Sequence, residues 1–181
     1  MDNVALPTVD VLHDLRQPPY PFAADYADEI ILSHVLEHFS LAEYQMILAE
    51  AARVLKPDGR VTISVPHALS PAFYSDPTHV SRFNFETFFY FSDEHTFSYY
   101  RSIHTRWRVT RLWASVNLVN NKFGPVGHFW QQLESFSTRV LSYSVRHSKN
   151  YTLPDLLVKQ LPFWLVNIHC QLAKVETVPA G

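Results

Sequence analysis

The chain has 181 residues, of which 47% are hydrophobic and 18% are charged; this balance excludes a disordered protein and favours one globular domain. The formal net charge of -2 provides no basic surface for nucleic acid, and a single cysteine excludes an internal disulfide. No signal-peptide pattern opens the chain and no apolar run reaches the roughly 20 residues of a membrane helix, so we expect a cytoplasmic protein with no membrane span and no nucleic-acid partner.

The first fifty residues predict strands and one capped helix. Residues 9–14 alternate apolar and polar side chains, which predicts a short strand, and the prolines within 18–21 force an extended loop. Residues 28–33 form a continuous apolar run, as in a parallel strand that is buried on both faces. Ser40 is followed three residues later by Glu43, a spacing that predicts a capping box at the start of a helix.

A strand follows that helix and completes an alternating pattern. The turn sequence at 57–59 ends the helix, and residues 60–65 resume as a strand. Alternation of strand, helix and strand predicts an α/β fold, in which ligands bind at the carboxyl ends of parallel strands. We therefore expect the strand ends at Asp14, Ser33 and His67 to lie at one edge of a sheet.

The second half of the chain is rich in aromatic side chains, especially within residues 68–135. Packing in a core explains them, and so does a wall that stacks against a ligand; the sequence leaves both interpretations open. The pattern predicts a strand over 104–116 and helices over 129–145 and 153–158. A last strand is predicted over 166–172.

Three blocks, residues 10–15, 26–39 and 50–60, resemble in sequence and in spacing the middle of class I S-adenosylmethionine-dependent methyltransferases of the type 11 kind. Residues 166–172 resemble the last strand of the same family. The resemblance implies a mostly parallel Rossmann-like sheet within one partial methyltransferase domain over residues 1–181, with 68–135 as a segment on the acceptor side. It also implies an enzyme that transfers a methyl group from S-adenosylmethionine to a small-molecule acceptor.

The resemblance assigns cofactor contacts to five residues. Asp2 falls where the family has the acidic residue that holds the ribose hydroxyls, through charge-assisted hydrogen bonds. Asp14 matches the acid that meets the adenine amino group, and the amide of Leu15 would meet a ring nitrogen of adenine. Ser33 and His34 match the loop that lies beneath the methionine part of the cofactor.

The glycine-rich loop of the family has no counterpart near the start of the chain. The four glycines are at positions 59, 124, 127 and 181, and none follows a strand near the start. Backbone amides approach the cofactor closely in that loop, which only glycine allows. We expect a chain that is N-terminally truncated before this motif and that lacks the first strand. Two alternatives remain open: a homodimer that rearranges the pairing, and a non-catalytic methyltransferase-like binding module.

Four histidines and one arginine are candidates for acceptor contacts or catalysis: His34, His38, His67, His79 and Arg82. Methyl transfer depends mainly on positioning, because the sulfonium is already activated, so no catalytic role is assigned to any of them. Residues 34–38 also spell the H-x-x-E-H pattern of some zinc peptidases. They are expected in a turn, where a third ligand would have to come from elsewhere, and we expect no metal.

Overall fold

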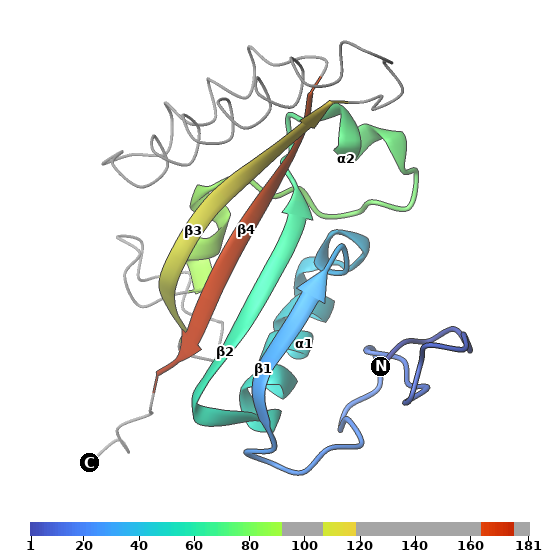
Figure 1. Ribbon diagram of the computed structural model, residues 1–181, viewed down its shortest axis with the longest axis vertical. Helices are drawn as coiled ribbons and strands as arrows, with labels where there is room; N and C mark the ends of the chain where they lie inside the picture. The colour runs from blue at the N-terminus through green and yellow to red at the C-terminus, as the bar shows by residue number, and fades with distance from the viewer. Residues whose placement is uncertain (92–106, 119–163, 176–181) are drawn as a thin grey trace, which may run out of the picture.

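The structure is a computed structural model, and it describes residues 1–91, 107–118 and 164–175. These residues contain a four-stranded sheet in the order β1-β2-β4-β3, with helix α1 on one face (Figure 1). No helix among them is long and apolar enough to cross a bilayer. The elements in chain order are β1 (Ala27–Ser33), the 3-10 helix η1 (Leu36–His38), α1 (Leu41–Val54), β2 (Leu55–Pro66), α2 (Pro71–Ser75), the 3-10 helix η2 (Glu86–Phe91), β3 (Trp107–Leu118) and β4 (Trp164–Lys174).

The sheet is mixed, so the expectation of a mostly parallel sheet is wrong. Strands β1 and β2 pair in parallel, whereas β4 pairs antiparallel with both β2 and β3. The strand–helix–strand pattern that predicted parallel pairing is formed by β1, α1 and β2, and there the pairing is parallel. The predicted strands over 28–33 and 166–172 are confirmed as β1 and β4. The strand predicted over 104–116 is found as β3 from residue 107 onward, whereas the helices predicted over 129–145 and 153–158 lie outside the described residues.

The strand predicted over residues 9–14 is not present as a strand. The segment forms one isolated parallel bridge, between Asp2 and Leu12. The Asp2 amide donates to the Val11 carbonyl at 3.1 Å, and the His13 amide donates to the Asp2 carbonyl at 2.8 Å. Alternation of side chains favours an extended backbone, but a strand also needs a partner of matching length, and only one residue pair supplies it here.

Helix α1 begins as the capping pattern predicts. Glu43 Oε2 accepts hydrogen bonds from the Ser40 amide at 2.7 Å and from the Ser40 hydroxyl at 2.8 Å. These bonds, with a further one from Arg16, lower the pKa of Glu43 to about 2. The apolar face of the helix, which includes the buried Ile47 and Leu48, packs against the sheet.

The described aromatic side chains of the second half lie mainly in the core. This supports the packing interpretation over the ligand wall for those residues, since a stacking wall has to be accessible. The sheet contributes the apolar side chains of β2 and β4 to the same core. Five aromatic side chains are between 0% and 3% exposed: Phe83, Phe85, Phe88, Phe91 and Trp107.

The turn predicted at residues 57–59 lies inside β2 instead. Leu55 pairs with Ala27 and Arg60 pairs with Glu29, so β2 has extra residues at this point and the register shifts. The turn-forming residues therefore make an irregularity within the strand, because β2 begins at Leu55, the residue that follows the last residue of α1.

Replacing Gly59 with alanine should destabilise this irregularity. An added Cβ would lie 2.6 Å from Leu55 Cγ and 3.0 Å from the Asp28 carbonyl oxygen. Leu55 is fully buried and cannot move freely, so we expect Gly59→Ala to lower the free energy of unfolding by about 1–3 kcal/mol. Urea unfolding measures this, with Asp58→Ala at the neighbouring exposed position as the control. Equal midpoints for the two variants would contradict the packing argument.

Candidate functional site

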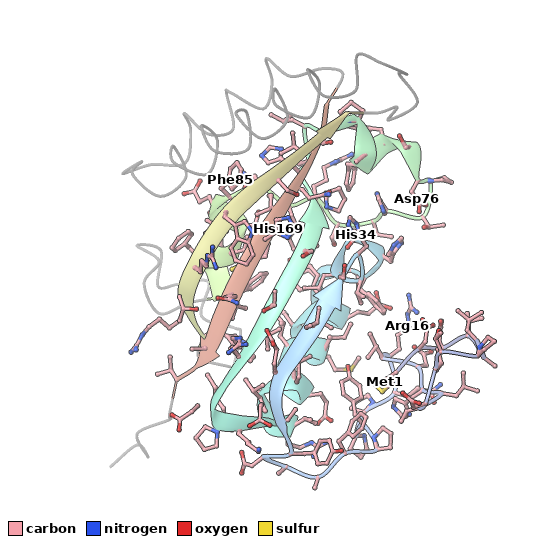
Figure 2. All side chains as sticks on the ribbon, in the orientation of Figure 1. Met1, Arg16, His34, Asp76, Phe85 and His169 are labelled. Atoms are coloured by element: carbon pink, nitrogen blue, oxygen red, sulfur yellow. The ribbon has the colours of Figure 1, made fainter. Side chains whose placement is uncertain are left out.

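The turn after β1 lies at the carboxyl edge of the sheet, where a ligand site is expected. Ser33 pairs with Ser64 of β2, and the His34 amide donates to the Ser64 carbonyl at 2.8 Å. His34 has a φ of 53°, a left-handed conformation that is uncommon outside glycine. Its side chain is 51% exposed, and Nδ1 lies 3.1 Å from Glu37 Oε1. Figure 2 shows His34 at this edge, on the side where Asp76 also lies.

The segment that contains Asp14 and Leu15 is fastened to the start of α1. Asp14 Oδ1 accepts from the Arg16 amide at 2.9 Å, and Arg16 Nε donates to Glu43 Oε1 at 2.8 Å. The guanidinium of Arg16 also stacks 4.5 Å above the Phe39 ring. The N-terminal segment with Met1 and Arg16 thereby lies beside β1 (Figure 2).

A buried tyrosine holds the same segment from the other side. The Tyr20 hydroxyl donates to the Leu15 carbonyl at 3.0 Å, and its amide donates to Glu50 Oε2 at 2.9 Å. Arg53 donates to the carbonyls of Tyr20 and Phe22 and pairs with Glu50 at 2.8 Å. Burial raises the pKa of the Tyr20 hydroxyl. We call Tyr20, Glu50 and Arg53 the clamp; it sets the backbone direction at Leu15.

A cavity joins the segments that carry the expected cofactor contacts. It has a volume of about 340 Å³ and is lined mainly by apolar side chains of the N-terminal segment, β1 and α1. Leu15 lines it, and so do Met1 and Val35, which are next to Asp2 and His34 in the chain. The volume lies within the range of small-ligand pockets, roughly 300–1,000 Å³.

Three of the histidine candidates come together. The His38 and His79 rings lie 4.8 Å apart. Glu37 Oε1 lies 3.1 Å from His34 Nδ1 and 4.0 Å from His79 Nε2. Residues 76–81 fold over η1, because the Val80 amide donates to the Glu37 carbonyl at 2.7 Å. One ligand atom from each of Glu37, His38 and His79 lies within 4.8 Å of the others, so these are the described residues that could hold a metal.

The other two candidates have different surroundings. His67 is fully buried, with Nδ1 accepting the Leu69 amide at 3.0 Å and its ring 5.1 Å from Phe85. Arg82 is exposed and places its guanidinium 5.6 Å from the centre of the Phe73 ring. The expectation that His67 and Arg82 contact an acceptor stays a prediction. An acceptor would have to reach both side chains beside the contacts that they already make.

A polar group on the sheet was missed by the sequence analysis. His169 Nδ1 lies 2.8 Å from Ser64 Oγ and Nε2 lies 2.7 Å from Ser115 Oγ, while the ring stacks 5.2 Å from Trp113. Burial lowers the pKa of His169. These residues come from three different strands, and no local pattern indicates a contact that depends on sheet order and register.

A scan of protein families matches part of the chain. Residues 4–63, about a third of the chain, match the family model described as a methyltransferase domain. A search of curated protein sequences finds no significant match.

A search of solved structures finds matches at low sequence identity. The chain is 15% identical to a SAM-dependent methyltransferase from Archaeoglobus fulgidus, covering 91% of this chain and 66% of that one, with a TM-score of 0.49. It is 17% identical to the YcgJ protein from Bacillus subtilis (92% and 71% covered, TM-score 0.45). For coclaurine N-methyltransferase the identity is 14%, with 90% and 52% covered and a TM-score of 0.42. The chain spans about two thirds of the first two proteins and about half of the third.

Proposed function

We propose, because residues 4–63 match the model of a methyltransferase domain, that the protein transfers the methyl group of S-adenosylmethionine to a small-molecule acceptor. The observation that carries the proposal is the cavity beside β1, which is bounded by all three segments that carry the expected cofactor contacts. The cavity is lined by residues of β1 from Ala27 to Leu32 and by Val35, so one end of it reaches the carboxyl edge of the sheet, where ligands bind in open α/β sheets.

Each cofactor contact then has a structural support. Asp14 would accept from the adenine amino group while Arg16 holds the segment to α1. The clamp orients Leu15, whose amide would meet the adenine ring. Asp2 is held beside residues 11–13, where its carboxylate would reach the ribose hydroxyls.

Ser33 and His34 would lie beneath the methionine part. The left-handed backbone at His34 turns the chain sharply at the end of β1, which is the kind of strained geometry that a surrounding site has to maintain. Catalysis would come from positioning the acceptor in line with the methyl group.

A non-catalytic methyltransferase-like module is the second candidate. The observation that favours it is that Gly59, the one glycine among the described residues, packs inside β2 rather than in a loop over a ligand. A module of this kind would bind S-adenosylhomocysteine without turning over S-adenosylmethionine, so formation of S-adenosylhomocysteine from S-adenosylmethionine separates the two candidates.

Replacing Asp14 with asparagine should weaken cofactor binding. The asparagine side chain keeps an oxygen for the Arg16 amide but loses the charge, and a charged hydrogen bond contributes about 1.5–3 kcal/mol. We therefore expect Asp14→Asn to raise the Kd for S-adenosylhomocysteine about 10- to 100-fold by calorimetric titration. Asp10→Asn, an exposed change in the same segment, is the matched control and should bind as the wild type does. A wild-type protein that does not bind, or two variants with equal Kd, would contradict the proposal.

A further inference from the structure

The turn after β1 contains a buried carboxylate with an unused oxygen. Glu37 is fully buried, and its Oε1 accepts from His34 Nδ1 at 3.1 Å. Its Oε2 has no hydrogen-bond partner among the residues that the structure describes. A carboxylate oxygen kept from water without a partner is costly, so a ligand bound at this atom would remove a penalty.

The hydrogen bonds around His38 determine which nitrogen is free. Its Nδ1 lies 2.9 Å from Thr78 Oγ1, and the Thr78 hydroxyl donates to Asp76 Oδ1 at 2.6 Å. Because a hydroxyl has one proton to give, Thr78 Oγ1 has to accept from His38 Nδ1–H. Neutral His38 therefore carries its lone pair on Nε2.

The hydrogen bond of His79 also leaves its Nε2 with the lone pair. Its Nδ1 lies 2.8 Å from the Phe73 carbonyl oxygen, which can only accept, so the proton of neutral His79 is on Nδ1 and the lone pair is on Nε2. Nε2 lies 4.0 Å from Glu37 Oε1 and 3.9 Å from Asp76 Oδ2, too far for hydrogen bonds. Histidines that bind metals usually donate their other N–H to a carbonyl or to a carboxylate-linked group, as both histidines do here.

We propose that Glu37, His38 and His79 bind one divalent transition-metal cation of the zinc class. Their ligand atoms lie within 4.8 Å of one another. Ligands with bonds of about 2.0–2.2 Å in a tetrahedral site are separated by roughly 3.4 Å, so small side-chain movements close the set around an ion. Two imidazoles and a carboxylate suit zinc, iron, cobalt and nickel rather than magnesium or calcium.

The site leaves room for a further ligand. Three protein ligands leave at least one coordination position open, and Asp76 Oδ2, which lies 3.9 Å from His79 Nε2, could supply a further oxygen. The inference goes beyond the proposed methyl transfer and does not depend on it. It also departs from the expectation of no metal, because residues 76–81 fold over η1 and bring the third ligand that residues 34–38 lack.

Cobalt(II) is the probe for the test, because its visible d–d absorption reports coordination by protein ligands. We expect the metal-free full chain to bind one equivalent of Co²⁺, and Zn²⁺ to displace it because zinc binds such sites more tightly. His79→Ala should bind Co²⁺ at least 100-fold more weakly. His13→Ala removes a histidine of the N-terminal segment whose Nε2 lies 2.7 Å from the Gln17 carbonyl, and it should bind as the wild type does.

Thr78→Val provides a second arm that leaves all three ligands in place. Loss of the hydroxyl that orients His38 should weaken Co²⁺ binding about 10- to 100-fold, and circular dichroism checks that both variants fold. If His79→Ala does not fold, Thr78→Val decides. No visible absorption from the wild type, or wild-type Kd in a folded variant, would overturn the metal site. Titration with S-adenosylhomocysteine in parallel separates this failure from failure of the proposed function.

Discussion

Phe83→Ala is expected to lower the free energy of unfolding by about 3–5 kcal/mol, the usual cost of removing a fully buried phenylalanine ring. The Phe83 ring is 0% exposed and lies 5.7 Å from Tyr44 of α1 and 5.8 Å from Phe88 of η2. Its backbone also bridges to His67 and accepts from the Ala68 amide at 2.7 Å. The ring therefore connects the helix, the end of β2 and the aromatic segment, and few neighbours can move into the space that it leaves.

Urea unfolding followed by fluorescence and by circular dichroism measures this loss. Tyr74→Ala removes an aromatic ring that is 65% exposed and should change the free energy of unfolding by no more than about 0.5 kcal/mol. If Phe83→Ala leaves too little folded protein, Phe83→Leu keeps most of the volume and should show a smaller loss in the same direction. Similar values for Phe83→Ala and Tyr74→Ala would mean that the aromatic segment is not part of the core.

Elements with local signals were predicted well. The apolar run of β1 and the Ser40–Glu43 cap of α1 each depend on side chains within a few residues, and each was found within two residues of its expected bounds. The sheet order could not be predicted in this way. The antiparallel pairing of β4 with β2 joins residues more than 100 positions apart, and apolar runs of either orientation look the same in sequence.

The candidate site also has parts that the local sequence indicates and parts that depend on distant residues. The spacing of His34, Glu37 and His38 is visible in the sequence, but its meaning depends on His79, which arrives through a loop and not through a periodic element. The clamp is similar, because Tyr20 meets Glu50 and Arg53 across 30 or more residues. The prolines within residues 18–21, beside Tyr20, predicted an extended loop. The backbone groups of an extended loop need hydrogen-bond partners elsewhere in the chain.

Tyr20→Ala should lower the free energy of unfolding by about 3–4 kcal/mol. Tyr20 is 7% exposed, and its hydroxyl supplies the hydrogen bond to the Leu15 carbonyl. Tyr20→Phe keeps the ring and removes only that bond. It should cost about 1–2 kcal/mol, because the Leu15 carbonyl loses its donor in a partly buried position.

The pair of Tyr20 variants also tests whether the clamp serves cofactor binding. If the hydroxyl holds Leu15 in the orientation that the adenine ring needs, Tyr20→Phe raises the Kd for S-adenosylhomocysteine several-fold while most of the stability remains. Tyr74→Phe, which removes a hydroxyl from a ring that is 65% exposed and does not line the cavity, serves as the control. Calorimetric titration and urea unfolding of the same samples distinguish the two roles. A raised Kd is expected because a Leu15 backbone freed from Tyr20 has to be ordered again when the adenine ring binds, at an entropic cost. An unchanged Kd with lowered stability in Tyr20→Phe would show that the clamp supports the fold alone.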